Sequence, residues 1–530
     1  MGRKLYVGGT ILTMAEDGFA EALLTEDGRI LAVGAETQVR GLAGDGETEV
    51  VQLEGKTVMP AFIDAHSHFS ACASAFLQGT VEGAESFDEL VENIRGYIRE
   101  KQIPAGKWVA IRDFDPGRLK EGRVPDRRVL DLASKDHPIV LQHKSGHVGV
   151  LNSMGLQAAG IGRDTPDPVG GRIWRESGEP TGYLEENAFL SVLGLLPSPT
   201  EEELMEAYEE TQRMYASYGI ATVQEGLMTR QMLPLYQKLC GEKRLWLEVV
   251  GYPSAADMES FYQAFPPRDG QYENGFRLGG CKMFLDGSPQ SRTAWMRTPY
   301  VGGEDCGYPV LTDGQVYETV AAAAGAGRQI LAHCNGDRAA EQYLQALKRA
   351  EEEGLRPERV RPVMIHAQLL GLDQLSELKR LGVIPSFFVA HVYHWGDTHI
   401  KNFGLERAAS ISPAASAGKL GLPYTFHQDA PVIRPDMLET VWCAVDRRTR
   451  DGVLLGGSEQ VTVLEALRAV TIRAAYQYFE EKEKGSLEPG KQADLVILDK
   501  NPLETDPSCL RKIQVLETVK AGETVYRREK

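Results

Sequence analysis

Two histidines stand one strand repeat apart near the start of the chain, in the apolar segment Val58–Phe69. Side chains alternate between the two faces of a strand, so we expect Asp64, His66 and His68 on one face. Two imidazoles in this arrangement can bind one metal ion. A carboxylate on the same face can orient one of the rings. A His-x-His pair also occurs by chance on solvated strands, so the prediction depends on further donor groups.

Four later apolar segments supply such groups near their ends. They are Gly280–Asp286 with Lys282, Ile330–His333 with His333, Val363–His366 with His366, and Tyr424–Asp429 with Asp429. Taken alone, either histidine fits an ordinary buried side chain, and the aspartate fits a helix N-cap. A buried lysine, however, is rare unless it is paired. Together these residues predict one metal site, because the alternative requires a coincidence at each strand.

The segments that carry these groups alternate with helical stretches between residues 60 and 479. Following the His66 strand, we expect strands at Ala221–Gln224, Leu245–Tyr252, Leu278–Leu285, Gln329–Cys334, Val363–Ala367, Val383–Val389 and Pro423–Gln428. Eight strands, each followed by a helix, predict an α/β protein with a (β/α)8 barrel, whose active sites lie at the carboxyl ends of the strands.

Residues 1–59 and 480–530 have a different sequence pattern, with short runs of β-forming residues and tight turns such as Asp27-Gly28. We expect both chain ends to build one small β-sandwich domain. Residues of about 70–205 break the strand–helix rhythm, and we expect them to form an insertion after the first barrel strand that covers the mouth of the barrel.

The composition narrows the class of protein. The 530 residues carry a net charge of −17, which argues against nucleic acid or an anionic membrane as the main partner. No apolar run approaches the length of a spanning helix, and the N-terminus lacks the pattern of a signal peptide. The 7 cysteines are widely spaced, without a C-x-x-C motif, which favours reduced thiols and a cytoplasmic location.

Several motifs along almost the whole chain resemble the metal-dependent amidohydrolase superfamily, and within it amidohydrolase family 3, which includes N-substituted formamide deformylases. The motifs are PAFIDAHSH from Pro60, GH from Gly146 followed by NS, EPTGYLEENA from Glu179, DGS from Asp286 followed by RTA, HCNGDRA from His333, DAPV from Asp429 and GSLEPGKQADLV from Gly485.

The resemblance implies a β-sandwich plus barrel and one or two divalent metals, usually Zn²⁺. His66, His68, Asp429 and Lys282 would hold one metal, and Lys282, His333 and His366 the second. In relatives with this lysine, a CO₂-derived carbamate on it bridges the metals. Burial would favour that reaction, because it lowers the pKa of the amine and only the neutral form adds CO₂.

The resulting expectation is hydrolysis of a C–N bond, in an amide or formamide of a small molecule, by a metal-activated hydroxide. Asp429 would act as general base and then as general acid. A deaminase or cyclic-amide hydrolase on the same scaffold is an alternative, and a non-catalytic interaction protein is a remote one. A homodimer is common in the resembling family.

The predicted substrate-binding residues are His147, Glu186, Arg292, Tyr393, Trp395 and Asp397, with Tyr183 and Tyr300 as further candidates. Residues 393–397 resemble a family loop near the site. Two departures from the family bear on the substrate. His427-Gln428 precedes Asp429 where much of the family has Gly-Ser, and Gln224-Glu225 replaces a common His-Asp pair.

Overall fold

The computed structural model of the protein describes residues 2–16, 18–43, 48–143, 148–266 and 271–529. It divides into one unit of Met1–Cys72 with Glu209–Lys530, and a second unit of Ala73–Tyr208. The second unit and the predicted insertion of about 70–205 cover nearly the same stretch. The predicted place of the insertion over a barrel mouth stays a prediction.

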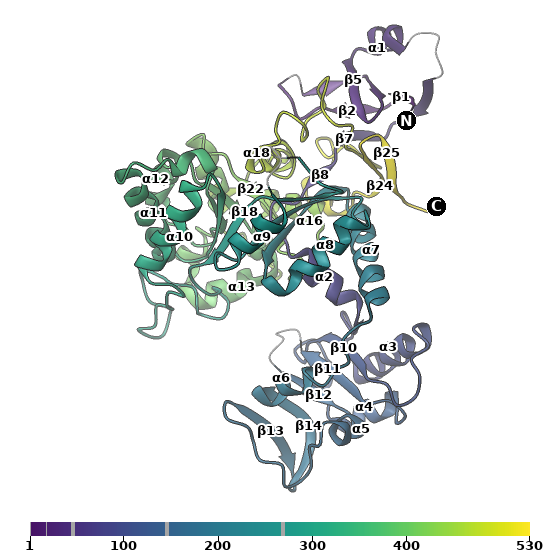
Figure 1. Cartoon of the computed structure of the whole chain (residues 1–530), viewed down its shortest axis with the longest axis vertical. Coiled ribbons are helices and arrows are strands. Elements are labelled where there is room, and N and C mark those ends of the chain that lie inside the picture. Colours follow the sequence, from purple (N-terminus) through teal and green to yellow (C-terminus); the bar gives the residue numbers. More distant parts are fainter. Residues whose placement is uncertain (1, 17, 44–47, 144–147, 267–270, 530) are drawn as a thin grey trace. The chain divides into compact units, whose positions relative to one another are not determined.

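Two parallel sheets in the first unit contain the strands that were predicted to carry the donor groups (Figure 1). The first has the order β17(Phe276–Leu278), β16(Glu248–Pro253), β15(Ile220–Met228), β8(Phe62–Ile63). The second has the order β18(Gly280–Phe284), β19(Gln329–Cys334), β20(Val363–His366), β21(Ile384–Phe387), β22(Thr425–Phe426). The predicted α/β class is therefore confirmed.

The two parallel sheets are joined through the chain at Gly279, which alone separates β17 from β18. A Cβ at this position would lie 2.4 Å from the ring of Tyr252, so only glycine fits here. At the far edges, the N–H of His68 donates to the carbonyl of Ala430 at 2.8 Å, beyond the ends of β8 and β22. Among the described residues, no continuous ladder closes the sheets into a ring.

Helices follow these strands, as the alternation predicts. In Figure 1, α10(Asp313–Gly325), α11(Asp337–Glu352) and α12(Leu375–Arg380) lie along one side of the second sheet. Helix α11 buries Ala339, Tyr343 and Leu347, which lie one helical turn apart on one face. The others in this unit are α1(Glu36–Ala43), α8(Leu233–Gly241), α9(Met258–Ala264), α13(His391–Phe403), α14(Leu405–Ala408), α15(Ala414–Lys419), α16(Met437–Asp446), α17(Val463–Ala469) and α18(Ile472–Gln477). Helices α2(Phe69–Phe76) and α7(Glu201–Ser217) each include residues of both units.

Both chain ends contribute to a β-rich region of the first unit (Figure 1). One sheet has the order β5(Arg29–Gly34), β4(Ala22–Glu26), β1(Arg3–Val7), β6(Thr48–Gln52). The other has the order β25(Glu523–Arg527), β24(Val515–Lys520), β23(Leu495–Leu498), β7(Thr57–Pro60), β2(Thr10–Leu12), β3(Phe19–Ala20). The predicted hairpin at Asp27-Gly28 is present, with φ angles of 48° and 82° that suit a type I′ turn.

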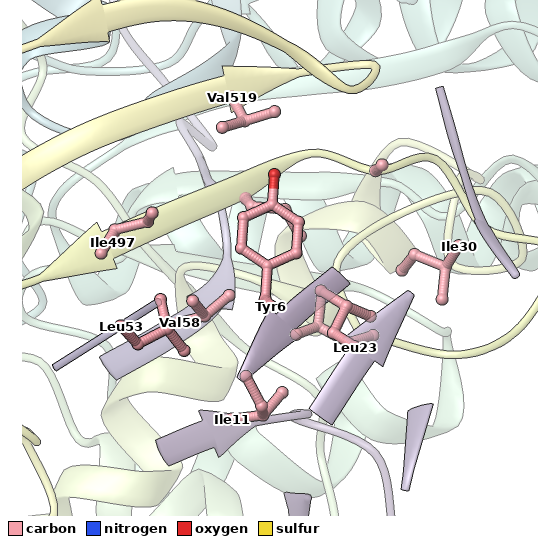
Figure 2. Close-up of a cluster of buried hydrophobic side chains, with 11 residues drawn as sticks. Tyr6, Ile11, Leu23, Ile30, Leu53, Val58, Ile497 and Val519 are labelled. Carbon is pink, nitrogen blue, oxygen red and sulfur yellow. The ribbon is translucent and has the colours of Figure 1, made fainter. Parts of the chain in front are cut away.

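A hydrophobic core joins the two ends of the chain. Tyr6, Leu23 and Val58 from the N-terminal strands pack with Ile497 and Val519 from the C-terminal strands, and Figure 2 shows these side chains pointing toward one another. This cluster includes residues from both sheets. The composite β-sandwich domain of residues 1–59 and 480–530 stays a prediction.

The second unit is a mixed sheet with helices. Its strand order is β13(Gly171–Glu176), β14(Glu179–Glu186), β12(Val148–Leu151), β11(Ile139–His143), β10(Val109–Phe114), β9(Gly79–Thr80). Its helices are α3(Phe87–Glu100), α4(Arg127–Ala133), α5(Ser153–Ala158) and α6(Asn187–Leu193). Helix α3 begins at Ser86, whose side chain accepts from the N–H of Glu89.

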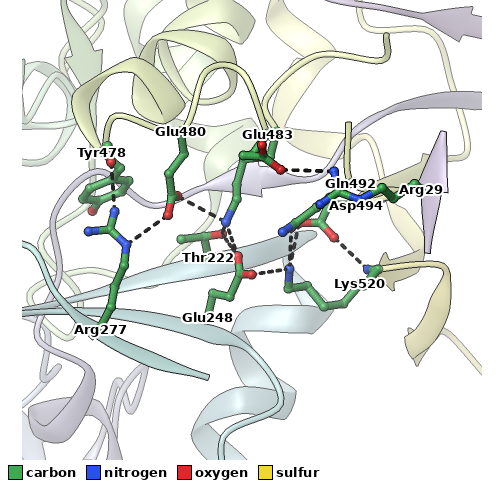
Figure 3. Close-up of polar contacts among 12 residues, drawn as sticks. Arg29, Thr222, Glu248, Arg277, Tyr478, Glu480, Glu483, Gln492, Asp494 and Lys520 are labelled. Atoms are coloured by element: carbon green, nitrogen blue, oxygen red, sulfur yellow. Dashed lines mark hydrogen bonds and ion pairs between the residues drawn. The ribbon is translucent and has the colours of Figure 1, made fainter. Parts of the chain in front are cut away.

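A buried ionic network connects the amino end of β16 to the C-terminal segment (Figure 3). Glu248 forms ion pairs with Lys484 and with Lys520, the latter at 3.1 Å, and Lys520 also pairs with Asp494 at 2.9 Å. A cavity of about 1100 Å³ borders Glu248 and Lys484.

Within the described residues, none of the helices combines the length and the apolar character that a membrane crossing requires.

Candidate metal centre

His66 and His68 lie in the segment directly after β8, which ends at Ile63. The strand is shorter than predicted, so strict alternation of faces does not continue through Asp64. Its Oδ1 accepts the backbone N–H of His66 at 3.2 Å instead of orienting an imidazole. Burial raises the pKa of Asp64 to about 6. The predicted role of Asp64 in orienting a histidine ring is therefore wrong.

The ring of His66 is oriented by Gln224 on β15. The Nε2 amide of Gln224 donates to the carbonyl of Ala65 at 2.9 Å, which turns its Oε1 toward His66 Nδ1 at 2.5 Å. Because an amide oxygen only accepts, Nδ1 of His66 carries the proton and Nε2 keeps its lone pair. Gln224, noted from sequence only as a departure from the family, thus leaves Nε2 of His66 in the form that can bind a metal.

Lys282 on β18 reaches the same place from the opposite sheet. Its Nζ lies 3.2 Å from Nε2 of His66, and the residue is 1% exposed. Burial lowers the pKa of Lys282 to about 7, although Asp429 opposes the shift. A large fraction of this amine is therefore neutral near neutral pH.

Asp429 lies between the histidines. Its Oδ1 is 3.4 Å from Nε2 of His66 and 3.3 Å from Nε2 of His68, and its Oδ2 is 3.9 Å from Nε2 of His366. Burial raises the pKa of Asp429, but the nearby imidazoles of His68, His366 and His66 favour its ionised form and hold the pKa well below its usual value. The group is a carboxylate at neutral pH.

The backbone is strained at two of these positions. His366, at the end of β20, has φ of 71°, and Asp429 has φ of 55°. Non-glycine residues in the left-handed region cost about 1 to 3 kcal/mol each, and such strain gathers at functional sites.

His333 belongs to the same group, although it is held differently. Its ring centroid lies 4.6 Å from that of His366, and its Nδ1 lies 3.6 Å from Oδ1 of Asp286. The two oxygens of Asp286 are fixed by the backbone N–H groups of Asn335 and Gly336, at 2.9 and 2.8 Å.

The structure therefore brings together all six predicted ligands, from five strands. Ligand atoms of His66, His366 and Asp429 lie within 4.8 Å of one another. Oδ1 of Asp429 and Nδ1 of His333 are buried and form no hydrogen bond among the described residues. Imidazoles and a carboxylate with unpaired buried atoms are a donor set that suits Zn²⁺ and related divalent metals.

The predicted substrate residues are more scattered. Tyr393, Trp395 and Asp397 lie on helix α13 rather than in the expected loop, because His391–Phe403 continues as a helix. Trp395 packs on Phe388, whose ring lies 6.1 Å from that of His366. The ring of Tyr393 lies 4.9 Å from that of Trp442.

The other substrate candidates have separate surroundings. Nε of Arg292 donates to Asn402 at 3.0 Å, and Tyr300 donates to the carbonyl of Ala294 at 2.7 Å. Asp397 accepts the N–H of Asp451 at 3.3 Å. Glu186 and Tyr183 lie in the second unit, on β14. His147 lies outside the described residues. All these substrate roles stay predictions.

Two supporting residues were missed by the sequence reasoning. Ser386, the only side-chain hydroxyl in the apolar strand β21, contacts His427, and Gly226 on β15 leaves room for His66. The isolated serine was the one visible signal.

The sequence is similar to that of known proteins along almost its whole length. The family model described as "Amidohydrolase family" matches residues 49–526. The chain is 30% identical to the N-substituted formamide deformylase of Arthrobacter pascens, over 97% of this chain and 96% of that protein. It is 27% identical to the protein YtcJ of Bacillus subtilis, over 99% of both chains.

A solved structure has a similar fold. It is an uncharacterized metal-dependent hydrolase from Pyrococcus furiosus, 26% identical, with a TM-score of 0.75 over 95% of this chain and 100% of that one. The resemblance that the motifs carry is thus confirmed over almost the whole sequence, and the chain belongs to the amidohydrolase family.

Proposed function

We propose that this protein is a metal-dependent hydrolase that cleaves the C–N bond of an amide or formamide in a small molecule. The observation that carries the proposal is the convergence of His66, His68, His366, Asp429 and Lys282 around one buried point. The family membership and the similarity to a formamide deformylase support the same reaction class. A closed (β/α)8 barrel is the architecture that we infer around this point.

The donor set suggests how one or two divalent ions, Zn²⁺ first among them, would be held. His66, His68 and Asp429 would hold one ion, while His333 and His366 would hold the second. The unpaired Oδ1 of Asp429 supports this assignment, because a cation would satisfy it.

Lys282 would complete both ligand sets as a carbamate. The neutral amine attacks CO₂, a nitrogen–carbon bond forms, and one proton leaves to solvent. The low pKa of this buried amine favours the reaction. The product is an anion, which offsets the positive charge of two ions.

A divalent ion, when bound, lowers the pKa of water and polarises a carbonyl group. Asp429 would take the proton of the attacking water and deliver it to the leaving nitrogen as the C–N bond breaks. Its low pKa keeps it ionised and ready to accept that proton. His66 stays neutral, because burial lowers the pKa of its ring well below the usual value.

The experiment that tests this function is a screen in which metal-loaded protein is incubated with N-formyl, N-acyl and cyclic amides. Hydrolysis is measured as the release of the amine. We expect an N-substituted formamide or a related amide to be turned over. Asp429→Asn should lose the activity, and an exposed control, Asp373→Asn, should keep it. Turnover of an amidine or aminopurine alone would instead indicate a deaminase. No turnover by protein that carries metal would contradict the proposal.

A further inference from the structure

His427 is fully buried and lies directly against a predicted metal ligand. Its Nε2 is 3.1 Å from Nδ1 of His366, and its own Nδ1 is 2.9 Å from Oγ of Ser386 on β21. The side chains of Ser386, His427 and His366 thus form a chain of contacts from strand β21 to the predicted metal centre. We propose that His427 is a positioning residue that fixes the ring and the proton of His366. This inference rests on the proposed function.

The direction of the hydrogen bonds follows from what His366 must do. To offer the lone pair of Nε2 to a metal, the ring must carry its proton on Nδ1. That proton needs a buried acceptor, and Nε2 of His427 is in place. His427 then carries its own proton on Nδ1 and donates it to Ser386. A single arrangement of protons thus satisfies all three groups.

Two further features show why His366 needs such support. Its backbone has φ of 71° and the next residue, Ala367, has φ of 47°, so the local conformation is strained. Water is not a ready substitute, because His366 is only 5% exposed and His427 and Ser386 are 0% exposed. Without His427, the Nδ1–H of His366 would be a buried donor without an acceptor, which favours the wrong proton position.

Two substitutions at position 427 separate the proposal from a general packing role. In His427→Gln, the amide oxygen lies as many bonds from Cα as Nε2 does, so it can accept from His366. In His427→Asn, the amide group reaches only the place of Nδ1, so it can contact Ser386 but not His366. Both variants remove the imidazole, and thermal unfolding of the metal-free proteins checks that both fold.

The measurement is the affinity of metal-free protein for Zn²⁺, by competition with a chromophoric chelator, together with the visible spectrum of the Co²⁺-loaded protein. We expect His427→Asn to weaken affinity by about 10- to 100-fold and to change the Co²⁺ spectrum. His427→Gln should remain close to the parent protein. Ser386→Ala, which keeps the bond to His366, should lie between the two.

Equal affinities and spectra for His427→Asn and the parent would overturn the inference, as would equal losses in the Asn and Gln variants. If His427→Asn does not fold, the Zn²⁺ affinity of Ser386→Ala becomes the test. An affinity equal to that of the parent protein would overturn the inference. Failure of the proposed function looks different, because the parent protein itself would then bind no divalent ion or hydrolyse no amide.

Discussion

Nζ of Lys282 lies 3.2 Å from Nε2 of His66, although the two residues come from different sheets and neither side chain reaches bulk solvent. Two basic groups at this distance cannot both carry a proton without strong repulsion. The charge of Lys282 therefore works with burial to lower the pKa of His66 well below its usual value. The centre is arranged for neutral nitrogen donors, which is the form that metals and CO₂ require.

Carbamate formation at Lys282 should depend on pH in a defined direction. Its pKa is about 7 in the folded protein, so the amine is mainly protonated below pH 7 and mainly neutral above it. The measurement is the ¹³C NMR signal of the carbamate that forms from ¹³CO₂ at fixed pressure. We expect this signal to grow between about pH 6 and pH 8, which is about one unit on either side of this pKa. Lys282→Gln should lack the signal.

A single methyl group at Gly226 should disturb the metal centre. A Cβ there would lie 2.6 Å from Cε1 of His66 and 2.7 Å from the carbonyl oxygen of Ser67, and the backbone contact cannot relax easily. We expect Gly226→Ala to weaken Zn²⁺ binding by about 10-fold or more in chelator competition. Gly241→Ala is the matched control, since a Cβ at Gly241 meets open space. Equal Zn²⁺ affinities for the two variants would show that the space left by Gly226 does not affect metal binding by His66.

Asp429→Asn should lower the rate of hydrolysis much more than it lowers substrate binding. The amide cannot accept the proton that the proposed mechanism places on Asp429, and general acid–base catalysis contributes about 10²- to 10⁴-fold. The measurement is kcat and KM of metal-loaded protein, with metal content determined for each sample. A variant that retains metal and full kcat would exclude Asp429 as the proton carrier.

The ionic network around Glu248 makes a prediction about stability rather than activity. Burial opposes the shift, but Lys484 and Lys520 lower the pKa of Glu248 to about 2. Because the pKa in the folded state lies below the ordinary value of 4.5, this carboxylate stabilises the fold above about pH 4.5. The stabilisation is lost as pH falls toward 2.

Removing one partner of the network should be costly. We expect Lys484→Met to lower the free energy of unfolding by about 3 to 5 kcal/mol, because it leaves a buried carboxylate without one of its partners. Lys482→Met, at a neighbouring exposed lysine, is the control. Urea unfolding at pH 7 measures both variants. Similar midpoints would mean that Lys520 alone compensates Glu248.

The sequence allowed the convergence of these side chains to be predicted, because each stands near the end of an apolar segment. His66, His333 and His366 end apolar segments, and parallel strands bring such ends to one edge. The order of the parallel strands follows from the alternation of apolar segments and helical stretches. The hairpin at Asp27-Gly28 is equally local, since the turn needs positive φ at both residues.

The interactions that support the ligands could not be predicted in this way. Gln224 meets His66 across 158 positions of sequence, and His427 meets His366 across 61. Such pairings depend on strand register and side-chain length, which no local pattern encodes. The error at Asp64 has the same origin, because β8 ends at Ile63 and the chain then bends away from a regular strand.

The metal content of catalytically active protein tests most directly whether His66, His68, Lys282, His333, His366 and Asp429 hold a catalytic metal. Protein purified without chelators should contain about one to two divalent ions per chain, and activity should disappear and return as the ions are removed and restored. Full amide-hydrolysing activity in protein that carries well under one ion per chain would contradict the account.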